Sequence, residues 1–146
     1  VFSAGEPPIA VARPGSVDAL QAVVKACAAA RTPVTVRGGG ASYTDGYLHR
    51  RPGGVTIDTG RLKRISIDEA NAVVTVEAGV TWAELHSALS ARGLRTPFWG
   101  PFSGLAATIG GSMSQNSISH GNGVSAESLV TIDVITGTGD MLSTGS

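Results

Sequence analysis

Arg37-Gly38-Gly39-Gly40-Ala41-Ser42 is the stretch that decides the fold, and it directly follows the apolar run Val34-Thr35-Val36. Glycine adds no side chain to a core, so packing of side chains does not explain three consecutive glycines. They supply positive φ angles and a bare backbone, whose successive N–H groups form an anion-binding concavity. The stretch predicts a strand that enters a phosphate- or pyrophosphate-binding loop. A flexible turn between two strands is the alternative, which the loop alone leaves open.

The composition restricts the class of protein and of ligand. The chain has 146 residues, enough for one domain with a core, and its 11 basic and 11 acidic residues balance. This balance argues against nucleic acid and anionic membrane surfaces as partners, because both attract a basic excess. No apolar run approaches the ~20 residues that a membrane span needs. The 20 glycines are about twice the usual share and gather in separate loops, which favours a backbone-lined site over a linker.

Neither the start of the chain nor its cysteine decides the compartment. No signal peptide is visible after Val1, and the chain does not begin with Met, so the compartment stays open. Cys27 is the single cysteine, which excludes an internal disulfide bond. Its place on the apolar face of an expected helix predicts a small core residue and not a reactive thiol.

Apolar periodicity and capping residues predict an α+β domain. One helix is expected from the N-cap Ser16 to Arg31, and a second helix follows the capping-box pattern Thr81-Trp82-Ala83-Glu84. Short strands are expected at 9–11, 34–36, 55–58, 65–67, 73–76 and 129–135, and from 141 onward. Helices and strands do not alternate regularly, so a doubly wound sheet is not expected.

Two further segments have a composition that suits a binding site. Residues 96–107 are expected to form a loop, in which Trp99 and Phe102 either line a pocket or, as loop aromatics do more often, pack on the core. Residues 108–123 carry four glycines and many uncharged polar side chains, which suits a bound polar ligand. The loops at 37–42 and 108–123 are therefore expected to hold the two ends of one long anionic ligand.

Common nucleotide, catalytic and metal motifs do not fit this chain. A Rossmann domain needs a helix directly after the glycine loop, and here the next segment is rich in turns. No Lys-Ser or Lys-Thr completes a Walker motif, and Ser103 lacks the first glycine of a nucleophile elbow. His49, His86 and His120 lack the spacing of metal ligands, so no metal site is expected.

Four motifs taken together resemble a known family. They are Arg37-Gly38-Gly39-Gly40-Ala41-Ser42, Glu77-Ala78-Gly79-Val80-Thr81-Trp82, Thr108-Ile109-Gly110-Gly111 and Val134-Ile135-Thr136-Gly137-Thr138-Gly139-Asp140. In order and spacing they resemble the FAD-linked oxidases of the vanillyl alcohol oxidase and p-cresol methylhydroxylase superfamily, with its PCMH-type FAD-binding domain. The resemblance covers nearly the whole chain, and the subgroup that it resembles most is cytokinin dehydrogenase.

The resemblance implies the fold and the domain organisation. A PCMH-type FAD-binding domain is α+β, with a small α/β subdomain followed by a mixed or antiparallel sheet with helices. The chain is then the N-terminal part of such a domain, with a first subdomain at 1–60 and an incomplete second subdomain at 61–146. Family enzymes are several times longer, so the substrate domain and its catalytic side chains are expected to be absent from this chain. No catalytic residue is assigned, and a hydrogen bond to the flavin edge is favoured over a role as base for His120.

The resemblance also implies which residues bind FAD. In the family the first glycine loop wraps the pyrophosphate, which assigns Gly38, Gly39, Gly40, Ala41 and Ser42. The positions that touch the flavin or the pyrophosphate correspond to Ser103, Thr108, Gly110, Gly111, Ser114 and Ile118. Further candidates for FAD binding are the nearby residues Gln115, Asn116 and His120. The alternative is that these three are ordinary polar residues of a loop.

Ala41 stands where many family members have the His that is attached covalently to the flavin. Alanine cannot form this bond, and no cysteine lies near the second loop to provide the other attachment of bicovalent members. We therefore expect FAD to be bound without a covalent link.

Three functions are compatible with the resemblance. The leading one is the FAD-binding part of an oxidoreductase in which FAD accepts a hydride from a small-molecule substrate, an alcohol, an amine or a hydroxy acid. The alternatives are a stand-alone flavin- or nucleotide-binding module without chemistry, and an inactive fragment that cannot hold FAD. The substrate, the electron acceptor and the oligomeric state stay open.

Overall fold

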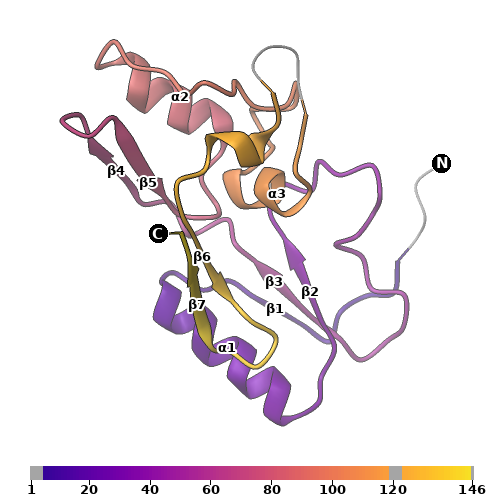
Figure 1. The fold of residues 1–146 in the computed structure, drawn as a ribbon. Helices are drawn as coiled ribbons and strands as arrows, with labels where there is room; N and C mark the ends of the chain where they lie inside the picture. Colours follow the sequence, from indigo (N-terminus) through magenta and orange to yellow (C-terminus); the bar gives the residue numbers. More distant parts are fainter. Residues whose placement is uncertain (1–4, 119–122, 146) are drawn as a thin grey trace. The chain divides into compact units, whose positions relative to one another are not determined.

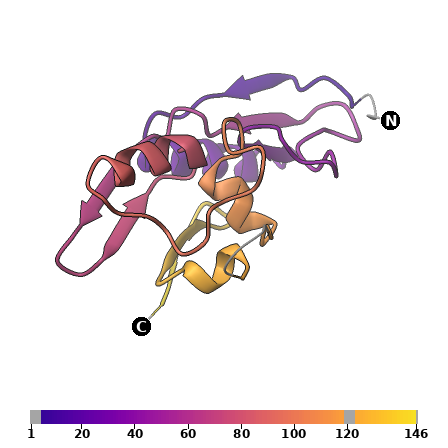
Figure 2. The same cartoon turned by 90° about the horizontal axis from the view of Figure 1, so that it is seen from above.

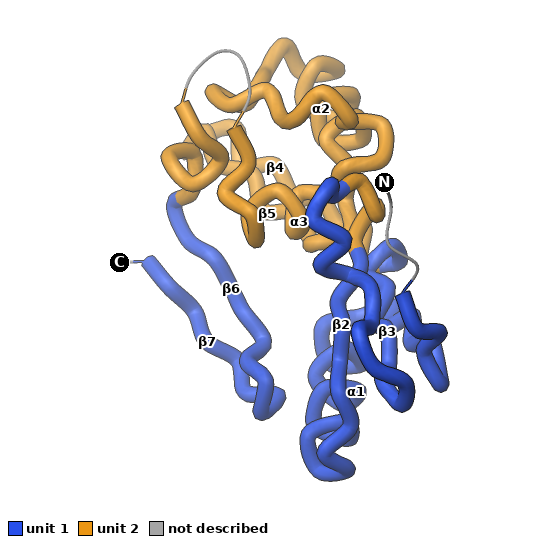
Figure 3. The backbone as a smooth tube through the Cα atoms, turned by 90° about the vertical axis from the view of Figure 1, so that its right-hand side faces the viewer, with its two compact units in different colours: residues 1–37, 42–61, 130–146 blue, residues 38–41, 62–129 orange. Residues whose placement is uncertain are grey.

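The computed structural model describes residues 5–118 and 123–145, and the chain falls into two compact units. Unit 1 is formed by 1–37, 42–61 and 130–146, and unit 2 by 38–41 and 62–129 (Figure 3). The glycine loop thus belongs to unit 2, although the strand before it belongs to unit 1. The division at 60/61 into family subdomains stays a prediction, and residues 130–145 group with unit 1.

Unit 1 contains a three-stranded parallel sheet in the order β1-β3-β2 (Figure 1). The strands are β1 Ala10–Ala12, β2 Val34–Arg37 and β3 Val55–Asp58. Parallel strands need a crossover connection, which α1 Val17–Ala29 provides between β1 and β2. Ser16 caps this helix by accepting a hydrogen bond from the Ala19 N–H at 3.2 Å, and Cys27 is buried on it, which confirms both expectations.

Side chains of unit 1 fix the sheet at the strand that leads to the glycine loop. Thr35 and Thr56 lie opposite each other on β2 and β3, and the Nε2 atom of buried His49 lies 3.0 and 3.1 Å from their hydroxyls. At the carboxyl end, Asp58 Oδ2 lies 3.5 Å from Arg13 Nε and 3.9 Å from Arg37 Nη1. These contacts hold β2 up to Arg37, its last residue.

The last part of unit 1 is an antiparallel hairpin of β6 Ile132–Ile135 and β7 Met141–Thr144. Its turn contains Gly139, whose φ of +87° lies in the left-handed region. A Cβ at Gly139 would overlap Lys25 of α1, so this glycine allows the turn to approach the helix. Strand β6 begins at Ile132 and is therefore shorter than the strand expected at 129–135.

Unit 2 contains the antiparallel hairpin β4 Ile65–Asp68 and β5 Val73–Val76, the helices α2 Trp82–Ser90 and α3 Ile109–Ser114, and the 3-10 helix η1 Ser125–Ser128. Figures 1 and 2 both show α3 next to η1. The buried core consists of Val80, Trp82, Leu85, Leu89, Phe98 and Ile109. The rings of Trp82 and Phe98 meet edge to face, with centroids 5.2 Å apart.

One expectation for unit 2 needs correction. Residues 109–114 form a helix, where the glycine pair predicted a loop. The core aromatic of the segment 96–107 is Phe98, at 1% exposed. Trp99 and Phe102 are 69% and 87% exposed, and Trp99 lines a pocket, which is one of the two alternatives left open for it. The capping box is confirmed, because Thr81 Oγ1 accepts from the Glu84 N–H while Glu84 Oε2 accepts from the Thr81 N–H.

Across residues 5–118 and 123–145, no helix has the length and apolar character of a membrane span. In the same residues, no three His, Cys, Asp or Glu side chains are grouped as ligands of a metal ion.

The start of α2 gives a prediction for stability and pH. Hydrogen bonds from Lys63 Nζ and then from the Thr81 N–H hold the pKa of Glu84 below its ordinary value of 4.5. A carboxyl group with a lowered pKa stabilises the fold above its unfolded-state pKa, and this contribution is lost as the pH falls through the folded-state pKa. Replacing Glu84 by Gln should therefore lower the free energy of unfolding at pH 7 by about 1 kcal/mol or less, since the pair is exposed.

Urea unfolding of both proteins at pH 7 and pH 3 measures this difference. We expect the difference between the two unfolding midpoints to be smaller at pH 3 than at pH 7. A difference of equal size at both pH values would contradict the assigned role of the Glu84 charge.

Candidate functional site

The glycine loop approaches residues 106–108 closely within unit 2. A Cβ at Gly38 would overlap Thr108 Oγ1, and one at Gly39 would overlap the carbonyl oxygen of Ala106. Only glycine lets two backbones come this close. Gly38 and Gly39 thus provide the bare backbone that was expected, and atoms of this chain itself approach it. Gly40, by contrast, has a φ of +68°, which glycine adopts without strain.

The N–H groups of the loop are the exceptional feature of this site. No described residue accepts a hydrogen bond from the backbone N–H of Gly38, Gly39, Gly40 or Ala41. All four residues are half-buried. A backbone N–H without an acceptor in the protein donates to water or to a ligand, so these four consecutive donors are available to either. A row of N–H groups without side chains suits the oxygen atoms of a phosphate or carboxylate.

The first turn of α3 offers no comparable donors. The N–H of Ile109 donates to the Val80 carbonyl at 2.8 Å, and that of Gly110 donates to the Ala78 carbonyl at 3.0 Å. The N–H of Gly111 donates to Thr108 Oγ1 at 3.2 Å. Thr108 is buried and acts as the N-cap of α3. The N–H groups of these residues are therefore used inside unit 2, and their predicted contact with FAD stays a prediction.

Gly110 has a packing role as well. A Cβ there would lie 2.6 Å from Ala78 Cβ and 2.9 Å from the Ala78 carbonyl oxygen. The contact brings α3 against the chain that leads into α2. Ala106 thus positions Gly39, and Ala78 positions Gly110, by close backbone contact. Nothing about an alanine in a sequence indicates such a role.

The polar candidates around the end of α3 have local partners. Ser114 Oγ donates to the Gly110 carbonyl at 2.8 Å. Asn116, with a φ of +44°, accepts through Oδ1 from the Ala126 N–H at 3.2 Å and so links α3 to η1. The Gln115 N–H donates to the Gly111 carbonyl at 3.3 Å. These roles hold the segment in shape, and a role in binding FAD stays a prediction for all three residues.

The remaining candidates lie in different surroundings. Ile118 is 73% exposed and forms a bridge with Val124, and Ser103 is exposed, with its carbonyl accepting from the Ala106 and Ala107 N–H groups. Ser42 lies in unit 1, where its Oγ accepts from the Thr44 N–H at 3.2 Å. His120 lies outside the described residues. Within unit 2 the structure brings Gly38 and Gly39 against Thr108 and the segment before it, and the role of the whole set in binding FAD stays a prediction.

Comparison with known proteins shows the family of the chain. The family of FAD-binding domains matches residues 8–145 of the chain. The chain belongs to this family. The superfamily of FAD-linked oxidases and the PCMH-type α+β fold predicted from the sequence are thereby confirmed.

Relatives of this FAD-binding domain include proteins that are named for 2-hydroxy acids. Glycolate oxidase subunit GlcD of Bacillus subtilis is 29% identical over 141 residues, which cover 94% of this chain and 30% of that protein. D-2-hydroxyglutarate dehydrogenase of Xanthomonas citri pv. viticola is 31% identical, covering 92% of this chain and 29% of the relative. The chain thus spans less than a third of the length of these curated relatives.

Solved structures share the fold of the domain. The structure of p-cresol methylhydroxylase with substrate bound has a TM-score of 0.80 and 23% identity, covering 99% of this chain and 30% of that one. Xylooligosaccharide oxidase from Myceliophthora thermophila C1, in complex with xylobiose, has a TM-score of 0.79 and 22% identity, covering 95% and 30%. The particular similarity to cytokinin dehydrogenase stays a prediction.

The contact of Gly39 with Ala106 gives a second prediction. Gly39→Ala places a methyl group on the Ala106 carbonyl, so it should destabilise the fold by about 3 kcal/mol through overpacking. Gly137→Ala is the matched control, because a Cβ at Gly137 meets nothing within 4 Å. Urea unfolding should show a large loss for the first variant and little change for the second. Equal stability of the two variants would contradict the close approach.

Proposed function

We propose that the chain binds FAD without a covalent link, with the pyrophosphate on the N–H groups of Gly38, Gly39, Gly40 and Ala41. The observation that carries the proposal is the row of four consecutive N–H donors without acceptors among the described residues. A pyrophosphate is a long anion with many acceptor oxygens, so it satisfies several adjacent donors at once. Membership of the FAD-binding domain family supports this choice of anion.

The chain's own residues would position the cofactor through backbone geometry. Gly39 against Ala106 fixes the loop within unit 2, and Gly40 turns it with a positive φ. Gly38 leaves room for the Thr108 side chain, which caps α3. These contacts lie within the chain itself, so they would hold the donors in place and lower the entropy cost of binding.

We further propose that the complete protein is an oxidoreductase. Bound FAD supplies an acceptor for a hydride, and the protein supplies binding, orientation and electrostatics. Of the three substrate classes expected, alcohols, amines and hydroxy acids, the names of the glycolate and D-2-hydroxyglutarate relatives support hydroxy acids. Substrate-binding side chains are expected in the part of the protein beyond this FAD-binding domain.

The side chains near the loop support non-covalent attachment. Ala41 carries a methyl group, which cannot bond to the flavin. Cys27, the only thiol, is buried on α1 of unit 1. Attachment therefore rests on hydrogen bonds and packing alone.

Acid precipitation tests this attachment. After incubation with FAD and removal of the excess, the protein should show the visible absorption bands of flavin. Precipitation with acid should then release all flavin into the supernatant. Flavin that stays in the washed pellet would contradict non-covalent binding, and a protein that never retains flavin would favour the interpretation as an inactive fragment.

A pair of variants at Ala41 tests the donors directly. Ala41→Pro removes one N–H donor, whereas Ala41→Gly keeps it and removes the methyl group. We expect FAD affinity to fall about tenfold or more in the proline variant and to change little in the glycine variant. Calorimetric titration with FAD measures both affinities, and circular dichroism checks that both variants fold. Equal affinities in two folded variants would remove Ala41 from the proposed pyrophosphate site.

A further inference from the structure

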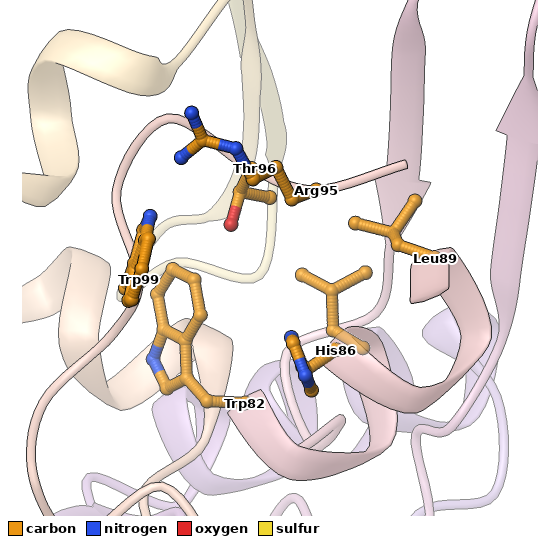
Figure 4. A pocket seen from close by; sticks show the side chains of 7 residues that line it. Trp82, His86, Leu89, Arg95, Thr96 and Trp99 are labelled. Carbon is orange, nitrogen blue, oxygen red and sulfur yellow. The ribbon is translucent and has the colours of Figure 1, made fainter. Parts of the chain in front are cut away.

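A cavity of about 430 Å³ opens in unit 2 between α2 and the segment 95–99 (Figure 4). Its buried side is formed by Trp82, Leu85 and Leu89 of the core. Its exposed side is formed by His86 and by Arg95, Thr96 and Trp99 of the segment after α2. The proposed pyrophosphate site uses none of these residues, and the volume lies within the usual range of small-molecule pockets, about 300–1,000 Å³.

Two indole rings bound this cavity, and one of them is held rigidly. Trp82 Nε1 donates a hydrogen bond to Ser112 Oγ at 2.7 Å, and its ring packs edge to face on Phe98. Trp99 stands on the other side and is 69% exposed. Figure 4 shows both indoles, with the guanidinium of Arg95 near Trp99. The Arg95 Cζ atom lies 5.6 Å from the centre of the Trp99 ring, within reach of a cation–π interaction.

The charge of the cavity is positive and uncompensated. Three of the four basic residues of unit 2 form ion pairs: Lys63 with Glu84, Arg64 with Glu77 and Arg92 with Glu69. Arg95 is the fourth, and no carboxylate of a described residue lies within 4.0 Å of it. The residues that line the cavity include no acid. An apolar cavity with one unpaired guanidinium is complementary to an apolar molecule that carries one negative charge.

We propose that this cavity binds a small planar aromatic carboxylate. The aromatic ring lies between apolar and indole surfaces, where stacking and burial favour it. The carboxylate lies on the planar guanidinium of Arg95, whose donors match its two oxygens. Arg95 is held over Trp99 before binding, which lowers the entropy cost of forming this contact.

The two tryptophans of the chain both line this cavity, so tryptophan fluorescence reports on it alone. The 146-residue chain, without FAD, is titrated with benzoate, with its neutral isostere benzamide and with non-planar cyclohexanecarboxylate. Benzoate should change the emission saturably, and the other two should bind about tenfold or more weakly. Absence of a saturable change with benzoate, or equal binding of benzoate and benzamide, would overturn the proposal.

A variant and its matched control separate the charge of Arg95 from general effects. Arg95→Gln should weaken benzoate binding about tenfold or more. Arg92→Gln removes an arginine of the same unit that is paired with Glu69 and does not line the cavity, so affinity should stay unchanged. Both side chains are exposed, and circular dichroism checks that both variants fold. Unchanged benzoate affinity in folded Arg95→Gln would refute the role of the guanidinium.

Discussion

The contact between the backbone of Gly39 and the carbonyl of Ala106 is the constraint on which the glycine loop depends. This contact leaves no room for a side chain at Gly39. At the neighbouring Gly38, the side chain of Thr108 leaves no room for one either. Through these contacts residues 38–41 belong to unit 2, although β2 before them belongs to unit 1. The loop is therefore fixed by packing, and its four N–H groups stay without acceptors in the described part of the chain.

The consecutive glycines thus have different physical tasks. Gly38 and Gly39 permit close approach, and Gly40 permits a left-handed backbone angle. The second glycine pair behaves differently again, because Gly110 packs on Ala78 and the first-turn N–H groups of α3 have acceptors within unit 2. Two similar glycine motifs in one sequence therefore differ in what they offer to an anion: the first presents free donors, and the second is a packed helix start.

Sequence patterns predicted the elements that are stabilised by contacts between residues close together in the sequence. The Ser16 cap, the Thr81–Glu84 capping box and the alternating hairpin strands were all readable because neighbours in sequence are the partners. Helix α3 was missed because Gly110 and Gly111 disfavour a helix, and contacts with Ala78 and Val80 stabilise it nevertheless. The sequence left open whether Trp99 lines a pocket or packs on the core, because core packing decided that Phe98 is buried and Trp99 exposed at the cavity beside α2.

The most direct test of the account is an amide NMR titration with inorganic pyrophosphate. The account predicts that the N–H resonances of Gly38, Gly39, Gly40 and Ala41 shift on binding, since these donors are free to bind oxygen atoms. The resonances of Ile109, Gly110 and Gly111 should shift much less, because their N–H groups already have acceptors. Shifts confined to 109–111, with none at 38–41, would contradict the central claim that the first glycine loop is the anion site.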